Sequence, residues 1–309
     1  MPVEFYHGMD HQHYDWNPLN GDRGVLRWPD NARVALCALL TLDHMEWRVP
    51  EGAFQSASLA GGYGPSPFPD VTRWSHREYG HRVGVYRLLD TLAKFDITPT
   101  VAMDVLTAEN YPFLVRHLKS LGCEIIAHGI SVSQQITENM PEQEEREYIQ
   151  SSMERMTGAI GTTPAGWLGP EYGESSRTPQ LLAQAGVSYI CDWTNDEQPY
   201  PIKAPQGQLT ALPINLPLDD VNALFDRHIP IGRYELMLKE GFDALYQEGA
   251  KNARLLVLNL HPWLMGQPFR VRYLARALDY MTRREGVWTA NGSEIVDWYR
   301  SNPPQANQT

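Results

Sequence analysis

Four short apolar segments of this chain each run into an acidic or imidazole residue. These end residues are Asp43, His128, Asp192 and His261. Carboxylate and imidazole groups serve as general acids and bases in enzymes, because their pKa values can be tuned towards the working pH. In a barrel of parallel strands, the carboxyl ends of all strands meet at one mouth. The spacing therefore predicts one catalytic pocket built from residues that lie far apart in the sequence.

Three of these residues, Asp43, His128 and His261, are predicted to be catalytic, although each has a structural alternative. Asp43 follows an apolar run, where it would otherwise cap a helix or loop. The two histidines would otherwise be hydrogen-bonded groups of the core. Gly129 after His128 permits a sharp turn at a barrel mouth, and Pro262 after His261 ends a strand. Both features favour a functional position.

Side chains close to these strand ends complete the predicted pocket. Glu171, in the segment Gly-Pro-Glu-Tyr-Gly, is predicted either to act as an acid or base or to cap the next helix, and both alternatives stay open. Arg270 would grip a substrate carbonyl or pair with Asp192, and Trp193 would stack on a substrate or simply pack. The predicted substrate-binding residues are His44, Glu46, Tyr172, Asp192, Trp193 and Arg270.

The hydrophobic pattern predicts that strands and helices alternate along the chain. The predicted strands cover residues 33–42, 98–103, 124–127, 165–169, 187–192, 209–214, 253–260 and 287–290. The predicted helices cover 77–94, 109–121, 141–160, 177–185, 233–248, 269–284 and 294–299, with loops at 48–75 and 194–208. Adjacent strand residues point to opposite faces, so at most one of Asp43 and His44 is expected to face the pocket.

This alternation is typical of α/β proteins with a parallel sheet. Seven or eight strand–helix units predict a distorted (β/α) TIM-like barrel. The 309 residues contain no Gly/Ser-rich linker, so a single catalytic domain over 1–309 is predicted, with an irregular N-terminal segment over 1–30. The loop at 48–75, rich in Gly and Pro, is expected to close the pocket.

Charge and composition exclude several classes of function. The formal net charge is −11 and no basic cluster is present, which argues against a nucleic acid partner. No apolar run reaches the ~18 residues of a membrane span, and the first residues lack the pattern of a signal peptide. With three cysteines, an odd count, the thiols are expected to be buried and reduced, and the protein is expected to be cytoplasmic.

Common catalytic motifs of other enzyme classes are missing from the sequence. It contains no Walker loop, no Gly-x-Ser-x-Gly elbow, no His-Glu-x-x-His motif and no paired cysteine motif. Nucleotide binding and serine hydrolase chemistry therefore have no support.

Several segments resemble the polysaccharide deacetylase family, also called the NodB homology group. They are Arg27–Ala35, Arg77–Val85, Ala127–Gly129, Asn195–Glu197 with Pro199 and Tyr200, and His261–Pro262 with Gly266 and Pro268. Within the family the chain looks most similar to the cytosolic branch of a metal-free allantoinase, cyclic imide hydrolases and a peptidoglycan deacetylase-like enzyme. The resemblance implies a distorted (β/α) barrel that hydrolyses a carbon–nitrogen amide bond.

The resemblance also bears on a metal. A metal-dependent member would use an Asp-His-His set, and here only Asp43 and His128 match, because Val132 occupies the second histidine position. Zinc sites normally use three or four protein ligands. No cofactor is therefore firmly predicted; zinc or another divalent metal would be held weakly through Asp43 and His128, with His44 or Glu46 as a replacement ligand. Relatives often form tetramers, so a homo-oligomer is expected.

The main functional prediction is a hydrolase of a carbon–nitrogen bond in a small amide, cyclic imides and ureides included. Asp43 is predicted as the general base, His128 as the group that positions water or substrate, and His261 as the general acid or oxyanion donor. Glu171 and Arg270 are predicted to orient the substrate. One alternative is a divalent-metal-dependent deacetylase of an N-acetylated saccharide or related substrate. Another is a binding protein that has lost catalysis.

Overall fold

The centre of the fold is β1 (Val34–Leu42), all of whose residues are buried. The computed structural model describes residues 11–17, 19, 23–53 and 69–304. β1 pairs in parallel with β2 (Thr100–Met103) and β8 (Arg254–Leu260), and its first residues also pair with β9 (Val287–Thr289). A strand buried on both faces is a continuous apolar run, which is why the sequence pattern identifies it.

The sheet continues from β2 through five shorter strands. In spatial order these are β3 (Glu124–Ala127), β4 (Gly166–Trp167), β5 (Tyr189–Ile190), β7 (Leu209–Ala211) and β6 (Tyr200–Ile202). Among the described residues every strand pairing is parallel except that of β6 with β7, and the edge strands β6 and β8 do not pair with each other. The expected α/β barrel class is confirmed, and its form is a curled half-barrel with a seam between the two edges.

The predicted loop over 194–208 is wrong at β6. The first and third residues of this strand are buried while Pro201 between them is exposed, and so short an alternation around a proline gives little sequence signal. Proline cannot donate to a sheet ladder, so it suits an edge strand. The chain before β6 bridges the seam, because the backbone N–H of Leu255 donates to the carbonyl of Glu197 at 2.7 Å.

β1 separates two apolar layers. Leu36 and Leu40 pack among the helices, whereas Cys37 and Leu39 pack inside the curl of the sheet. Because side chains alternate along a strand, Asp43 continues the inner row.

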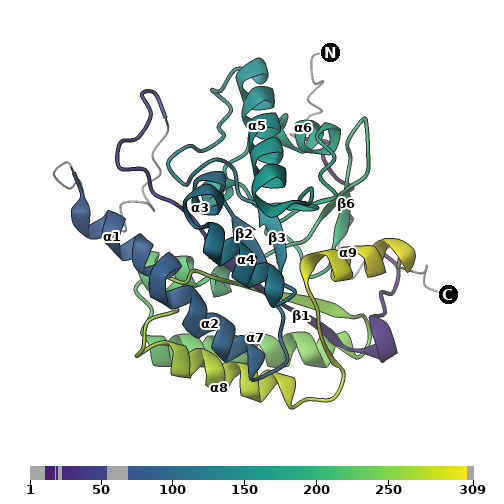
Figure 1. The fold of residues 1–309 in the computed structure, drawn as a ribbon. Helices are drawn as coiled ribbons and strands as arrows, with labels where there is room; N and C mark the ends of the chain where they lie inside the picture. Colours follow the sequence, from purple (N-terminus) through teal and green to yellow (C-terminus); the bar gives the residue numbers. More distant parts are fainter. Residues whose placement is uncertain (1–10, 18, 20–22, 54–68, 305–309) are drawn as a thin grey trace.

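Helices cover the outer face of the sheet (Figure 1). α7 (Ile231–Gly249) and α8 (Val271–Thr282) run side by side, and α2 (Val85–Ala93) packs on α8. The remaining α-helices of the described residues are α1 (Val71–Tyr79), α3 (Val105–Asn110), α4 (Pro112–Ser120), α5 (Glu142–Ile160), α6 (Thr178–Gln184) and α9 (Gly292–Ser301). In this part of the chain no helix is both long enough and apolar enough to cross a membrane.

The helix predicted over 77–94 begins earlier, as α1 (Val71–Tyr79). The side chain of Asp70 accepts a hydrogen bond from the N–H of Arg73 at 3.1 Å and so caps the first turn. The helix then continues into α2 through η3 (Gly80–Gly84), a π-helical turn. Such turns inside helices are rare and are frequent at functional sites.

Three other expectations concern a helix, a loop and the cysteines. The helix predicted over 109–121 is divided into α3 and α4, because Pro112 has no N–H to continue the first helix. The predicted loop over 48–75 ends at α1, and its residues 54–68 lie outside the described residues. All three cysteines are buried and unpaired, as expected: Cys37, Cys123 and Cys191.

Candidate active site

A cavity of about 190 Å³ opens at the carboxyl ends of the strands. The ends of β1, β3, β4 and β8 line it, together with the segment after β7. Its polar lining residues are Thr41, Asp43, His128, Glu171, Tyr172, Asp219, Asn222, Asp226, Asn259 and His261. The geometry therefore brings together the four residues predicted to be catalytic, with Tyr172 from the predicted binding set.

Strand alternation places the side chains of β1 and β8 in this cavity. Thr41 and Asp43 share one face at the end of β1, and Asn259 and His261 share one face at the end of β8. The hydroxyl of Thr41 donates to Oδ1 of Asn259 at 2.6 Å. This hydrogen bond joins the two neighbouring strands directly beneath the candidate acid and base.

His261 is held by Asp220. Its ring Nδ1 donates to Oδ1 of Asp220 at 2.7 Å, and its backbone N–H donates to Oδ2 at 2.9 Å. Burial by itself lowers the pKa of His261, but the charges of Asp220, Asp219 and Asp43 and the hydrogen bond to Asp220 outweigh burial and raise the pKa to about 9. At neutral pH His261 is therefore an imidazolium that keeps its Nε2–H as a donor.

His128 has the opposite protonation state. Its Nδ1 lies 2.7 Å from the carbonyl oxygen of Leu168, which can only accept, so Nδ1 carries the proton. Burial lowers the pKa of His128 to about 4; the nearby Asp43 opposes this shift, and the positive charges of His261 and Arg77 add to it. His128 is therefore neutral at neutral pH, and its Nε2 keeps a lone pair.

Arg77 is the cation beside Asp43. One guanidinium nitrogen forms a close ion pair with Oδ2 of Asp43, and the other lies 3.9 Å from Oε1 of Glu171. The guanidinium also lies over the ring of Trp263, 5.0 Å from its centre. Only 7% of Arg77 is exposed, so this charge acts in a poorly screened environment.

A hydrogen-bond network links the remaining polar side chains of the cavity. Oδ2 of Asp219 accepts the hydroxyl of Tyr172 and the amide of Asn259, each at 2.8 Å. Oδ1 of Asp219 accepts the N–H of Asn222 at 2.9 Å, at the start of η6 (Val221–Asp226). Burial and the charge of Asp219 raise the pKa of Tyr172 well above its ordinary value, so Tyr172 stays a neutral donor.

The segment that carries Glu171 and Tyr172 has an unusual backbone. Both residues have positive φ angles, 52° and 58°, in the left-handed region that side chains other than glycine rarely adopt. Backbone strain of this kind clusters at functional sites, where the surrounding structure holds it in place. Here it turns two side chains of one short segment into the same cavity.

His44 and Glu46, both predicted to bind substrate, lie outside the cavity lining. His44 is on the opposite face of the chain from Asp43, and its Nδ1 lies 3.4 Å from Oε1 of Glu78. Oε1 of Glu46 accepts the hydroxyl of Ser131 and the amide of Gln134, each at 2.5 Å. These contacts fasten the segment after β1 to its neighbours.

Asp192, Trp193 and Arg270 also lie outside the lining. Oδ1 of Asp192 accepts the N–H of Gly169 at 2.6 Å. The indole N–H of Trp193 donates to Glu174 at 3.0 Å. Arg270 donates to a backbone carbonyl of the turn that precedes α8, at 3.2 Å. The contacts of Asp192 and Arg270 hold the backbone of loops, and that of Trp193 joins two side chains.

Sequence reasoning missed several residues of this site, and four of them, Arg77, Asp219, Asp220 and Asn259, contact the predicted catalytic residues or support them. Asn259 has a usable signal, because a polar residue interrupts an apolar strand two positions before His261 and must share its face. Asp219 and Asp220 follow a short Leu-Pro-Leu segment without a strand or helix pattern, so nothing local points to their role. Arg77 lies at the start of the predicted helix over 77–94 and in a segment of the family resemblance, but nothing in the sequence indicates that it pairs with Asp43.

Two groups of described residues offer metal-ligand atoms, and neither fits a tightly held ion. Asp43 and His128 supply two ligands, the guanidinium of Arg77 already occupies one oxygen of Asp43, and Val132 is a buried hydrocarbon. Asp219, Asp220 and His261 form a buried group whose ligand atoms lie within 4.8 Å of one another. However, Nδ1 of His261 already donates to Asp220, and both oxygens of Asp219 accept hydrogen bonds.

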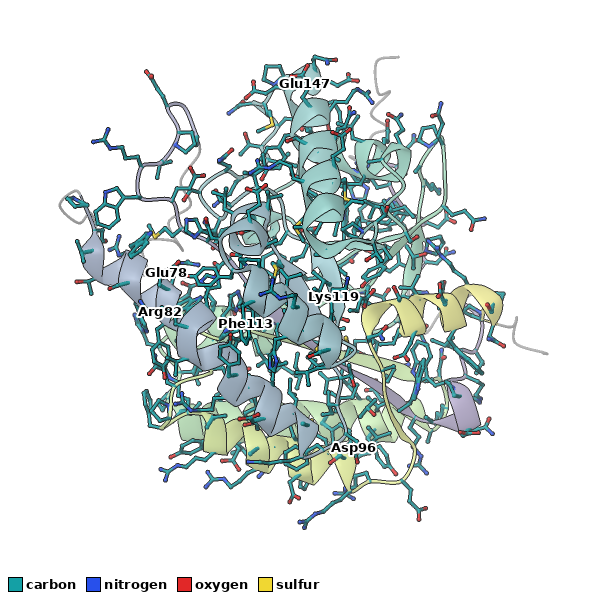
Figure 2. The ribbon with its side chains drawn as sticks, in the orientation of Figure 1. Glu78, Arg82, Asp96, Phe113, Lys119 and Glu147 are labelled. Carbon is teal, nitrogen blue, oxygen red and sulfur yellow. The ribbon has the colours of Figure 1, made fainter. Side chains whose placement is uncertain are left out.

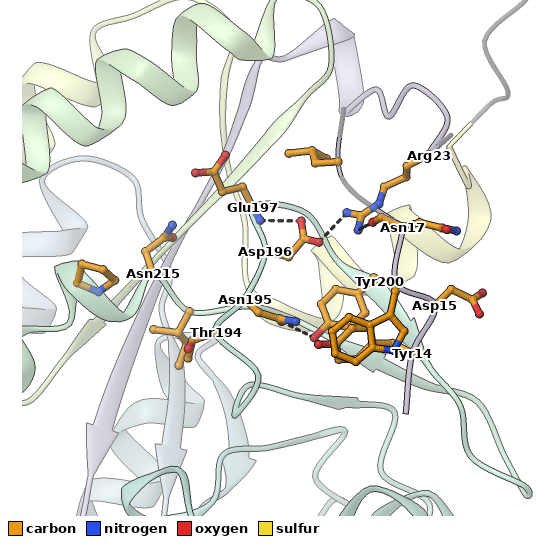
Figure 3. Close-up of a pocket in the computed structure, with 14 residues that line it drawn as sticks. Tyr14, Asp15, Asn17, Arg23, Thr194, Asn195, Asp196, Glu197, Tyr200 and Asn215 are labelled. Carbon is orange, nitrogen blue, oxygen red and sulfur yellow. Dashed lines mark hydrogen bonds and ion pairs between the residues drawn. The ribbon is translucent and has the colours of Figure 1, made fainter. Parts of the chain in front are cut away.

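A larger hollow of about 640 Å³ lies between the N-terminal segment and residues 194–197 (Figure 3). Its polar side chains mainly bind one another. Asp196 pairs with Arg23 at 2.7 Å, and Asn195 accepts the hydroxyl of Tyr200 at 2.6 Å. Among its described lining residues there is no histidine, whereas the smaller cavity is lined by both His128 and His261.

The half-barrel fold and the comparisons with known proteins indicate a hydrolase that acts on carbon–nitrogen bonds other than peptide bonds. Residues 78–190 match the family model described as polysaccharide deacetylase. The expected family resemblance is thereby confirmed.

Individual proteins are similar to this chain over almost its whole length. The chain is 25% identical over 321 residues to a Schizosaccharomyces pombe protein named "Putative polysaccharide deacetylase", with 95% of this chain and 100% of the relative covered. It is 26% identical to the crystal structure of PuuE allantoinase, with a TM-score of 0.77 and 90% and 94% of the two chains covered. It is 27% identical to a "probable Polysaccharide deacetylase" from Pseudomonas aeruginosa PAO1, with a TM-score of 0.78 and the same coverage.

Proposed function

We propose that this chain hydrolyses a carbon–nitrogen bond in a small amide, with cyclic imides and ureides as the preferred class, and that it needs no tightly bound metal. The observation that carries the proposal is the pair of buried histidines in one cavity, where Nδ1 of His128 contacts the carbonyl of Leu168 and Nδ1 of His261 contacts the carboxylate of Asp220. Amide hydrolysis needs an acceptor for a proton of water and a donor for the leaving nitrogen. The cavity of about 190 Å³ suits a small ring better than a polymer.

In the proposed mechanism Asp43 is the general base. It takes a proton from water while the water oxygen attacks the substrate carbonyl carbon, and Nε2 of His128 accepts the second hydrogen of the water. His261 donates its Nε2–H to the carbonyl oxygen and stabilises the developing oxyanion. When the carbon–nitrogen bond breaks, His261 gives a proton to the leaving nitrogen. The proton held by Asp43 then restores the charge of His261 through solvent.

The other predicted binding residues receive different roles in this proposal. Glu171 orients the substrate by accepting an N–H of its ring, because its carboxylate lines the cavity. Tyr172 positions Asp219 and Asn259 by hydrogen bonding. Arg270, which lies outside the lining, holds the turn that follows His261 instead of touching substrate.

A second candidate function is the removal of an acetyl group from an N-acetylated substrate. The similarity to proteins named as polysaccharide deacetylases favours it. The same base and acid would break the same type of bond, so the two candidates differ in substrate and not in chemistry. The size of the cavity favours the small cyclic amide.

The proposal is tested with a panel of cyclic imides, cyclic ureides, linear amides and N-acetylated sugars, each assayed with and without chelator. We expect turnover of a cyclic substrate that persists in chelator. Stoichiometric zinc in the purified protein, with activity that chelator abolishes and zinc restores, would contradict the metal-independent mechanism. No turnover of any amide would favour the binding-protein alternative.

A further inference from the structure

Two adjacent ion pairs join α1 to the end of β1. Arg77 pairs with Asp43 on the inner side, and Glu78 pairs with His44 on the outer side, with Nδ1 of His44 3.4 Å from Oε1 of Glu78. The carboxylate of Glu78 also accepts the hydroxyl of Tyr111. Arg77 and Glu78 are each 7% exposed, so both pairs are shielded from solvent. The position of the guanidinium is therefore fixed by the fold.

The next turn of the helix is fitted just as closely to the turn that follows His261. A Cβ atom added to Gly84 would lie 2.0 Å from the carbonyl oxygen of Pro262, and one added to Gly80 would lie 2.7 Å from the backbone nitrogen of Trp263. Only glycine permits this approach. The ring of Trp263 in turn lies beneath the guanidinium of Arg77. One helix therefore places a cation between the candidate base and the segment that carries the candidate acid.

This cation competes with a metal ion for the same carboxylate. A divalent ion on Asp43 and His128 would sit beside a guanidinium that cannot lose its proton. The guanidinium and the metal ion, both positive and both next to the carboxylate of Asp43, would repel each other strongly in a buried, poorly hydrated site. Conversely, without Arg77 the carboxylate of Asp43 would be left buried and uncompensated, which favours the capture of a cation.

We infer that Arg77 is the resident cation of this active site: a positioning residue that neutralises and orients Asp43 and keeps divalent metal off the Asp43–His128 pair. The role of Arg77 in catalysis rests on the proposed function. The effect of Arg77 on metal binding does not rest on it, so either role can be disproved without the other.

The first test measures zinc binding by titration calorimetry and needs no substrate. The variants are Val132→His, Arg77→Gln and the double variant, with Arg82→Ala as a control. Arg82 is exposed and lies on the same helical run (Figure 2). We expect the double variant to bind zinc ~10–100-fold more tightly than Val132→His alone, and Arg82→Ala to bind like the parent. Equal zinc affinities of Val132→His with and without Arg77→Gln would overturn the inference.

A charge-preserving variant guards against loss of the fold. If thermal melting shows that Arg77→Gln is unfolded, Arg77→Lys combined with Val132→His replaces it. Lysine keeps the positive charge, so we expect zinc affinity equal to that of Val132→His alone. A gain in affinity with lysine would show that the charge at residue 77 does not exclude metal, and the inference would be wrong.

The second test uses turnover of a substrate found in the amide panel. Arg77→Ala should lose activity by about a hundredfold, because the base is no longer oriented. Added guanidinium ion should restore part of the activity, whereas urea at the same concentration, a neutral analogue of similar shape, should not. Rescue by urea, or no rescue by guanidinium in a folded variant, would contradict the role of the charge. If no substrate exists, the proposed function fails and the zinc titrations still decide the inference.

Discussion

The two histidines of the cavity differ in charge because their Nδ1 partners differ. His128 donates to the neutral carbonyl of Leu168, whereas His261 donates to the carboxylate of Asp220. Burial disfavours an imidazolium in both cases, and only a carboxylate partner compensates for that cost. The acceptor at Nδ1 and the nearby charges thus give two histidines of one cavity opposite shifts in pKa.

The Asp220→Asn variant should have a shifted pH profile of kcat/KM. Without the carboxylate, the pKa of His261 should fall from about 9 towards or below the ordinary value near 6.5. Because His261 acts in its protonated form, the alkaline limb of kcat/KM should shift to lower pH. The control is Asp243→Asn, a carboxylate on α7 that binds Tyr280 instead. An unchanged alkaline limb in Asp220→Asn would refute the assignment of His261 as the acid.

Asp43→Asn and His261→Gln should each lower turnover by at least ~10²-fold, since each removes a general base or acid. The isosteric Asp43→Asn would be expected from sequence alone to leave stability nearly unchanged. The structure changes that expectation, because Arg77 loses its buried partner, and breaking a buried ion pair costs about 3–5 kcal/mol. Urea unfolding measures the cost, and turnover per folded molecule measures the catalytic loss. Near-normal turnover in Asp43→Asn would point to Glu171 as the base.

At the scale of elements, the decisive contact is that of η3 with the turn after His261. Gly84→Ala should cost about 1–3 kcal/mol and lower turnover, because the added Cβ would collide with the carbonyl of Pro262 and displace the turn that carries the acid. Gly158→Ala in α5 is the matched control: nothing lies within 4 Å of its Cβ, so it should stabilise the helix by up to about 1 kcal/mol. The melting temperatures of the two variants measure this difference in stability, and equal values would contradict the packing argument.

The element boundaries were predictable where a long apolar run sets them. β1 and β8 follow directly from apolar runs, whereas α1 begins at the cap of Asp70, inside a stretch that composition alone assigns to a loop. β6 is a three-residue edge strand that exists because β7 is available to pair with it. Elements that depend on pairing with a distant segment have only a weak signal in their own sequence.

At the scale of the whole molecule, stability should fall as the pH rises from 6.5 to 9. Burial raises the pKa of Asp104 to about 8, and the surrounding carboxylates raise the pKa of His261 to about 9. Over this range the folded state holds more protons than the unfolded state, so the free energy of unfolding decreases with pH. Urea midpoints at pH 6.5 and 9 check this, and His261→Gln should weaken the dependence. A midpoint that rises towards pH 9 would contradict it.

The barrel class and the positions of Asp43, His128 and His261 at strand ends could be predicted from the amino-acid sequence. Both follow from local regularities, since apolar runs define strands and parallel strands gather their carboxyl ends at one mouth. Which groups meet at that mouth depends on the packing of elements that are distant in the sequence. Asp220 lies 41 residues from His261 and Arg77 lies 34 residues from Asp43, so each pair forms only when separate elements pack together. The charge state of each catalytic group depends on those partners and on burial, which a one-dimensional pattern does not contain.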